Sequence, residues 1–260
     1  MDLNLKNKNA LVCGSTQGIG KATAMALASE GANITLVARN ERKLKQVLKE
    51  LPDTDNHSYI VADFSFPDDL KNKVSSFIEN NHGFHILVNN TGGPKSGNIL
   101  NAEVSEFEKA FAMHVKCNHI LAQALIPFMK SEGFGRIINI ISTSVKEPIP
   151  GLGVSNTIRA AVGNWSKTLA TELGDLGITV NNVLPGFTDT ERIAEITKSK
   201  AEKEGLSFDE MSKIMKSYAP ANRFAKPEEI ANAVVFLASK AASYVNGINL
   251  PVDGGRTKSL

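Results

Sequence analysis

The chain has 260 residues, of which 42% are hydrophobic and 22% are charged. This composition is typical of a globular protein and excludes a disordered tail or a collagen-like chain. With 29 Lys and Arg against 27 Asp and Glu, the net charge of +2 gives no electrostatic reason to bind nucleic acid. At about 150 residues per domain the length would allow one or two domains, and α/β folds of this size are often a single unit.

Short apolar runs alternate with longer amphipathic runs, which predicts parallel strands joined by helices. The expected strands are 9–14, 34–38, 59–62, 86–88, 136–141, 179–184 and 248–250. The expected helices are 19–31, 41–51, one beginning at Pro67, a long one from about Glu103, 156–176 and 227–239. The runs 136–141 and 179–184 are apolar on both faces, as buried parallel strands are. The pattern predicts an α/β fold in one domain, residues 1–260.

The segment 188–222 interrupts this alternation. It is charged and loosely helical, and an insertion of this kind after a strand predicts a lid over a substrate site. Its lysine-rich part, 198–203, alternates with Glu. That pattern favours a solvated surface over a patch for nucleic acid.

The two cysteines, Cys13 and Cys117, lie inside apolar runs, which predicts buried free thiols in a reducing compartment. No apolar stretch approaches the roughly 20 residues that span a bilayer. Residues 1–8 lack the hydrophobic segment of a secretory signal. We therefore expect a cytoplasmic protein with no membrane partner. The histidine pairs lack ligand spacing, so no metal site is expected.

A glycine-rich turn, Gly14-Ser15-Thr16-Gln17-Gly18-Ile19-Gly20, lies between the first strand and the first helix. Glycines at this position let the backbone approach a pyrophosphate, which then lies at the helix N-terminus. They could also be simple turn residues. Their place after a first strand and before a long helix favours a dinucleotide site.

The end of the second strand indicates which dinucleotide is bound. An acidic residue there would select NAD through the ribose 2′-OH. This chain has Arg39, followed by Arg42 and Lys43. A guanidinium suits a 2′-phosphate, so NADP(H) is predicted. The alternative is that Arg39 is only a solvated surface charge.

Several further motifs occur in a consistent order along the chain. They are Asp63-Phe64, Asn89-Asn90-Thr91-Gly92, Asn139-Ile140-Ile141-Ser142, Pro185-Gly186-Phe187-Thr188-Asp189-Thr190, Pro227-Glu228-Glu229-Ile230-Ala231 and Asp253-Gly254-Gly255. Together with the glycine-rich turn, they make the chain resemble the short-chain dehydrogenase/reductase family over essentially its whole length. It is similar to the 3-oxoacyl-carrier-protein reductases. The resemblance implies a Rossmann-like, doubly wound sheet, an NADP(H)-dependent oxidoreductase acting on a small carbonyl or alcohol substrate, and a homo-oligomer, either a tetramer or a dimer.

The resemblance also implies roles for the residues that match the family motifs. The glycine-rich turn, Gly14 to Gly20, would hold the pyrophosphate. Asp63 and Phe64 would contact the adenine, and Asn90, Thr91 and Gly92 the adenosine ribose. The segment after the sixth strand would contact the nicotinamide through Pro185, Gly186, Thr188 and Thr190.

The family's catalytic Asn-Ser-Tyr-Lys set is largely replaced here. Ser142 matches the Ser position, but the Tyr position is Ser155 and the Lys position is Arg159, which would also contact the cofactor ribose. The Asn position is His114. A Ser hydroxyl is a poor proton donor without a base beside it, and an Arg stays charged. His114 is the only newcomer that titrates near neutrality.

Three hypotheses follow. In the first, Ser142 and Ser155 polarise the substrate oxygen, Arg159 supplies positive charge and His114 relays the proton. His114 could equally be a structural residue. In the second, the protein is a catalytically inactive dinucleotide-binding regulator or scaffold subunit. In the third, the scaffold performs elimination or enoyl reduction. Of the three tyrosines, only Tyr218, at the end of the expected lid, could reach a substrate.

Overall fold

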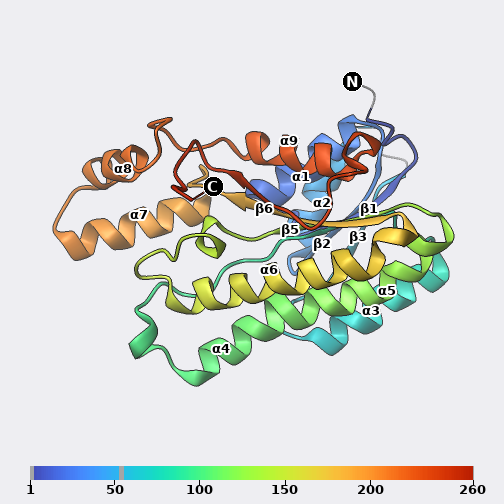
Figure 1. The fold of residues 1–260 in the computed structure, drawn as a ribbon, viewed down its shortest axis with the longest axis horizontal. Coiled ribbons are helices and arrows are strands. Elements are labelled where there is room, and N and C mark those ends of the chain that lie inside the picture. The colour runs from blue at the N-terminus through green and yellow to red at the C-terminus, as the bar shows by residue number, and fades with distance from the viewer. Residues whose placement is uncertain (1–2, 53–55, 260) are drawn as a thin grey trace.

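A computed structural model describes residues 3–52 and 56–259 and contains a parallel sheet of seven strands (Figure 1). The order across the sheet is β3-β2-β1-β4-β5-β6-β7. The strands are β1 (Asn9–Cys13), β2 (Asn33–Ala38), β3 (Ser58–Val61), β4 (Ile86–Asn89), β5 (Gly135–Ile140), β6 (Ile178–Pro185) and β7 (Asn249–Val252). Every neighbouring pair is parallel. The predicted fold class, a Rossmann-like doubly wound sheet, is confirmed.

Helices cover both faces of the sheet (Figure 1). One face carries α1 (Gly18–Ser29), α2 (Glu41–Glu50) and α9 (Pro227–Ala238). The other carries α3 (Pro67–Asn80), α4 (Val104–Phe111), α5 (Cys117–Ser131) and α6 (Gly153–Leu173). The helix expected over 156–176 is α6, which begins three residues earlier than expected. Its C-terminal end continues as a 3₁₀ turn, Gly174–Leu176.

Each face of the sheet has its own apolar layer, because successive strand side chains point to opposite faces. In β1, Ala10 and Val12 join the layer under α1 and α9, whereas Leu11 and Cys13 join the layer under α5. Cys117 lies in the same layer as Cys13, and both thiols are free and buried, as predicted. Burial raises the pKa of both thiols, that of Cys117 to about 12, so neither sulfur is a ready nucleophile.

The central strands are buried as predicted, but they are not wholly apolar. Asn139 and Asn182 are fully or almost fully buried in β5 and β6. The Asn89 amide donates to the Asn139 side chain at 2.8 Å, and the Asn139 amide donates to Asn182 at 2.9 Å. The Asn182 amide then donates to Asn249 at 2.8 Å. This ladder of side-chain amides links four neighbouring strands, because in-register parallel strands place equivalent residues side by side.

The long helix expected from Glu103 is present over residues 104–131, but it contains a π turn that the sequence did not predict. It consists of α4, a π-helical turn over Ala112–Lys116 and α5. A π turn inserts one residue into the helical repeat and is often found at functional sites. The apolar periodicity continues through the insertion, so the sequence pattern does not reveal it. The insertion contains His114.

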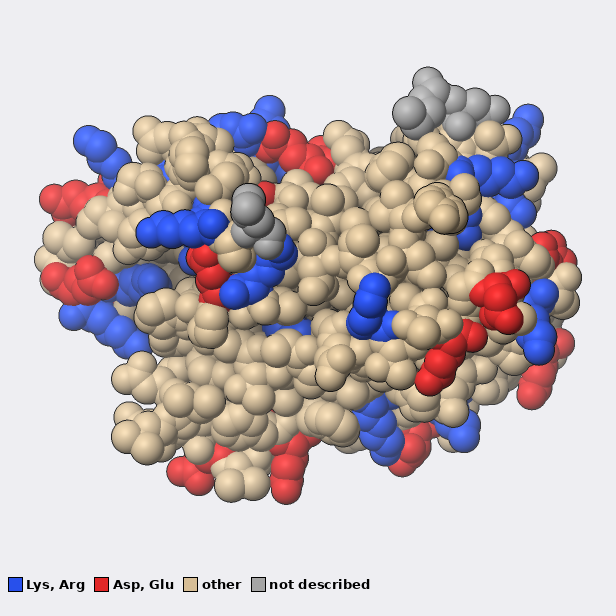
Figure 2. Space-filling model, in the orientation of Figure 1, with Lys and Arg blue, Asp and Glu red and all other residues tan. Residues whose placement is uncertain are grey.

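The expected lid segment forms two helices, α7 (Glu191–Glu204) and α8 (Phe208–Ser217), which extend from one end of the molecule (Figure 1). They pack on each other through a small apolar cluster that includes Ile193, Met211 and Met215. On the face shown in Figure 2, Lys, Arg, Asp and Glu side chains intermingle at this end. The segment therefore has its own small core and a mixed-charge surface.

None of the helices in the described ranges combines the length and the apolar character needed to cross a membrane.

Candidate cofactor and active site

The site lies where the strand order reverses between β1 and its neighbours β2 and β4. Doubly wound folds bind ligands outside the carboxyl ends of their strands at this point. The glycine-rich turn leaves β1 here and enters α1. Gly14 has φ +60°, and a Cβ on it would lie 2.5 Å from the Asn90 carbonyl oxygen. Only glycine allows this backbone conformation beside the turn after β4.

Asn90 holds the two turns together. Its side-chain amide donates to the carbonyl oxygens of Cys13 and Gly14, at 3.3 and 3.4 Å. Ser15 is fully buried and donates through both its N–H and its hydroxyl to the Val37 carbonyl, each at 3.4 Å. The predicted pyrophosphate turn is therefore fixed to β2 and to the turn after β4.

The segment after β6 reaches the same turn. Gly18 has φ +53°, and a Cβ on it would lie 3.0 Å from Cγ2 of Thr190. Thr190 donates to the Thr188 carbonyl at 3.2 Å, and Thr188 donates to the Gly186 carbonyl at 3.2 Å. The structure thus brings Thr190, predicted to contact the nicotinamide, next to Gly18, predicted to contact the pyrophosphate. Pro185 ends β6.

The residues predicted to select NADP and to contact the adenine follow β2 and β3. Arg39 is exposed directly after β2, and Asp63 follows β3 by two residues. Since Ala38 pairs with Val61, these chain segments leave adjacent strands at the same edge. Asp63 accepts the Ser65 N–H at 2.8 Å, and Phe64 is buried. Lys43 donates to Gln17 at 3.2 Å, which ties α2 to the glycine-rich turn.

These surroundings fit a dinucleotide. The first turn of α1 contains no acidic residue, so its free N–H groups and positive dipole end would face a pyrophosphate without repulsion. A Cβ on Gly92, in the turn after β4, would meet nothing within 4 Å. Space for a ligand therefore remains beside the turn.

The four predicted catalytic residues come from three elements at this edge. Ser142 follows β5, where its hydroxyl accepts the Ser144 N–H at 3.1 Å and caps a short 3₁₀ turn, Thr143–Val145. Ser155 and Arg159 lie one turn apart on α6 and share a face. His114 comes from the π turn.

Thr91 connects two of these four residues. Its hydroxyl lies 2.7 Å from Nδ1 of His114, and its carbonyl accepts from Nη2 of Arg159 at 3.5 Å. Nη1 of Arg159 donates to the Ile140 carbonyl at 2.8 Å. Within the described ranges, no hydrogen bond joins Ser142 or Ser155 to this group. The structure therefore forms a Thr91–His114–Arg159 unit to which neither serine is bonded.

Burial controls the charges of this unit. His114 is 2% exposed, and burial, followed by the nearby charge of Arg159, holds the pKa of its imidazole well below the usual 6.5. The ring is thus neutral at pH 7. Its Nε2 atom has no hydrogen-bond partner among the described residues. Burial and the charge of Arg192 lower the pKa of Arg159 to about 10, so Arg159 remains a cation at neutral pH.

Two arginines near these residues were not predicted from the sequence. Arg192, in the first turn of α7, donates to the Pro94 carbonyl at 2.8 Å. Arg256, near the C-terminus, donates to the Thr143 hydroxyl at 2.8 Å and lies 4.6 Å above the Phe187 ring. Neither belongs to a motif, and only the fold brings them near the site. Thr91 was expected to contact the cofactor; its bond to His114 was not foreseen.

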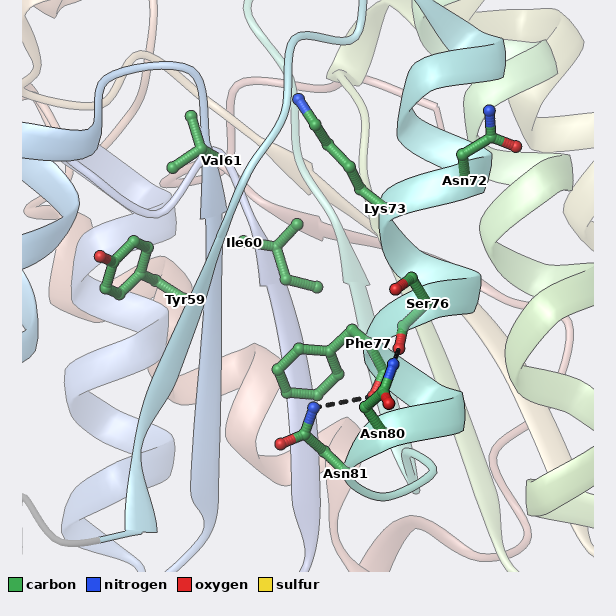
Figure 3. Close-up of a pocket in the computed structure, with 9 residues that line it drawn as sticks. All are labelled: Tyr59, Ile60, Val61, Asn72, Lys73, Ser76, Phe77, Asn80 and Asn81. Carbon is green, nitrogen blue, oxygen red and sulfur yellow. Dashed lines mark hydrogen bonds between the residues drawn. The ribbon is translucent and has the colours of Figure 1, made fainter.

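A separate hollow of about 600 Å³ lies between β3 and α3, and its lining contains none of the predicted site residues (Figure 3). The side-chain amides of Asn80 and Asn81 in its wall donate to the backbone of α3 at 2.7 and 3.0 Å. Within residues 3–52 and 56–259, no group of three His, Cys, Asp or Glu side chains is arranged to hold a metal.

Comparison with known proteins places this geometry in a family. The family model described as enoyl-(acyl carrier protein) reductase matches residues 14–257. The 3-oxoacyl-(acyl-carrier-protein) reductase FabG of Rickettsia bellii is 32% identical over 253 residues, which cover 97% of this chain and 98% of that protein. The NADPH-dependent reductase BacG of Bacillus subtilis is 29% identical over 98% of this chain and 100% of its own.

Solved structures give the same result. The L-sorbose reductase of Gluconobacter frateurii, in complex with NADPH and L-sorbose, matches with a TM-score of 0.93 at 33% identity and covers 100% of both chains. The chain belongs to the short-chain dehydrogenase/reductase family. The family and the enzyme class predicted from the sequence are confirmed. The predicted cofactor, NADP(H), agrees with the NADPH bound in this relative.

Proposed function

We propose that the protein is an NADP(H)-dependent oxidoreductase that interconverts a carbonyl compound and an alcohol through an atypical active site. The observation that carries this proposal is the Thr91–His114–Arg159 unit beside the glycine-rich turn. Its residues occupy the region where the family keeps its catalytic groups, and they offer hydrogen-bond donors, a cation and a neutral imidazole. The cofactor-binding residues named above stay predictions.

When bound, NADPH supplies a hydride to the carbonyl carbon. The carbonyl oxygen then becomes an alkoxide that needs one proton to give the alcohol. Arg159 is positioned to stabilise this developing charge, because its guanidinium is buried and fixed by the carbonyls of Ile140 and Thr91. Ser142 and Ser155 would donate hydrogen bonds to the same oxygen.

The proton would travel through Thr91 and His114. A neutral imidazole has one donor and one acceptor nitrogen, so it can take a proton on one nitrogen while releasing the proton on the other. The buried ring, with Arg159 nearby, disfavours a lasting imidazolium. His114 would therefore pass a proton on rather than store it.

The test has two measurements. Fluorescence titration measures NADPH binding, and turnover is measured on a panel of ketones, aldehydes and alcohols. His114→Ala should lower kcat by about 10²-fold or more, as expected for a lost acid–base group, while NADPH binding persists. His119→Ala, at an exposed histidine in the next helix, is the matched control. NADPH binding without turnover on any substrate would instead support the inactive regulator.

A second candidate is reduction of a carbon–carbon double bond. The matched family model is described as an enoyl reductase, and the loss of the Tyr position removes the usual donor for an alkoxide. Proton NMR of the products from an α,β-unsaturated ketone separates the two activities, because one product is a saturated ketone and the other is its isomer of equal mass, an allylic alcohol that keeps the vinyl protons.

We further propose that residues 188–222 close over the substrate and that the chain forms a homo-oligomer in the cytoplasm. Large apolar side chains are exposed at the start of α4 and in the turn before it, including Ile99, Leu100 and Val104, and such patches favour association. The buried free thiols suit a reducing compartment. Light scattering on the purified protein tests the oligomer, with a monomeric mass as the contrary result.

A further inference from the structure

Two guanidinium groups bind the same short loop after β4. Arg159, from α6, donates to the carbonyl of Thr91 at 3.5 Å, and Arg192, from α7, donates to the carbonyl of Pro94 at 2.8 Å. These carbonyls are three residues apart. The loop thus brings one buried and one partly exposed cation to the region of the proposed reaction.

Within the described part of the chain, no carboxylate forms an ion pair with Arg159. Arg159 is 9% exposed, its hydrogen bonds go to backbone carbonyls, and the charged group that acts on it is another cation, Arg192. The ion pair of Arg192 with Glu195 is long, at 3.5 Å, and lies on the surface, where such pairs contribute little. Burying an arginine without a counter-charge is costly, and a bound anion would remove that cost.

The loop also leaves room beside the guanidinium groups. A Cβ on Gly92 or on Gly97 would meet nothing within 4 Å, and a Cβ on Gly93 would meet only Nη2 of Arg159, at 3.8 Å. The Arg192 side chain is 44% exposed, so it can turn toward a ligand. Both arginines can offer paired N–H groups, a geometry that suits carboxylate oxygens.

We propose that Arg192, beside the buried positive charge of Arg159, binds an anionic group, and that the substrate is a carbonyl compound that carries a carboxylate. This proposal rests on the proposed function. The same chemistry could instead be met by a phosphate of the cofactor. The glycine-rich turn and the N-terminus of α1 are the predicted site of the cofactor pyrophosphate, whereas the two arginines lie on α6 and α7. This separation favours the substrate as the source of the anionic group.

The first experiment compares oxo acids with their methyl esters, which differ in charge at nearly equal size. Acetoacetate and levulinate are the probes, each beside its ester. The wild-type protein should favour the acid by about tenfold or more in kcat/KM, the order of one charge-assisted contact. Arg192→Gln should abolish this preference, and Lys198→Gln, an exposed cation on the same helix, should keep it. Equal kcat/KM for acid and ester in the wild type would overturn the proposal.

A second measurement separates the two sources of the anion and does not need turnover. Calorimetry records the binding of levulinate to the NADP⁺-loaded protein, and NADPH affinity is measured on the same variants. We expect Arg192→Gln to weaken levulinate binding at least about tenfold with unchanged NADPH affinity. A loss of NADPH affinity instead would assign the site to the cofactor, and no binding of levulinate by the wild type would also overturn the proposal. Levulinate binding without any turnover would support the anion site and contradict the proposed function.

Discussion

The Thr91 hydroxyl lies 2.7 Å from Nδ1 of His114, which joins the end of β4 to the π turn that interrupts the α4–α5 helix. The bond fixes the orientation of a buried imidazole whose charge is suppressed by burial and by Arg159. The Thr91 carbonyl also accepts a hydrogen bond from Arg159. Thr91 therefore positions both His114, the proposed proton relay, and Arg159, the cation proposed to stabilise the alkoxide.

Thr91→Val should therefore separate catalysis from cofactor binding. Valine keeps the shape of threonine and removes its hydroxyl, so His114 loses its oriented partner. We expect kcat to fall by about 10²-fold, the usual contribution of a positioned acid–base group, with little change in NADPH affinity. Thr91→Ser keeps the hydroxyl and should keep most of the activity. Equal losses in both variants would mean that packing, rather than the hydroxyl, is what matters.

The buried histidine makes the fold sensitive to acid. The pKa of His114 is well below 6.5 in the folded protein, so between that value and 6.5 only the unfolded chain binds the proton. Stability is then complete above about pH 6.5 and is lost as pH falls, at up to about 1.4 kcal/mol per pH unit for one group. His114→Gln should flatten this dependence in urea unfolding between pH 7.5 and 5. A residual slope is expected from His85, whose pKa burial also lowers. An unchanged slope in His114→Gln would show that His114 does not cause the loss of stability in acid.

Gly14 should not tolerate a side chain. Its φ of +60° and the 2.5 Å approach of an added Cβ to the Asn90 carbonyl combine backbone strain with a clash. Together they should cost Gly14→Ala roughly 2–4 kcal/mol, and NADPH binding should be lost. Gly97→Ala is the control, because its methyl group would meet nothing within 4 Å and its φ is not positive. Thermal unfolding and NADPH titration measure both effects, and equal behaviour of the two variants would refute the role of the close approach.

The comparison with the sequence separates local signals from long-range ones. The strand and helix alternation, the glycine-rich turn and the identity of the replaced catalytic positions are all legible in the chain. Each depends on residues close together in sequence, such as the period of an apolar run or the spacing from Ser155 to Arg159. These signals were sufficient for the fold class and for the family.

The contacts that create the site were not legible, because they join segments far apart in the chain. Arg256 reaches Thr143 across 113 residues, and Arg192 reaches Pro94 across 98. Neither arginine occupies a motif position. The π turn is also hidden, since Ala112–Lys116 contains neither Gly nor Pro, the residues that commonly mark an irregular helix.

The amide ladder in the sheet gives a stability prediction. Asn139 is completely buried and bonds to Asn89 on one side and Asn182 on the other. Asn139→Ala would leave an amide donor and an acceptor unpaired in the core, and we expect a loss of about 2–5 kcal/mol from two such groups. Asn164→Ala, at an exposed helical position, should change stability by no more than a few tenths of a kcal/mol. Urea unfolding of both variants measures the difference, and a near-neutral Asn139→Ala would show that water replaces the lost bonds.

Tyr218 gives a prediction that bears on the proton donor. Among the three tyrosines, Tyr59 donates to Glu41 at 3.0 Å beside β3, Tyr244 is fully exposed, and Tyr218 lies at the end of α8 with its ring 6.3 Å from that of Phe187. If the proton passes through Thr91 and His114, Tyr218→Phe should leave kcat and its pH profile essentially unchanged, because only a half-exposed hydroxyl is removed. A loss of about tenfold or more in kcat would instead make Tyr218 the donor. In that case Thr91→Val should leave kcat nearly unchanged. The kcat values of the two variants together therefore show which route the proton takes.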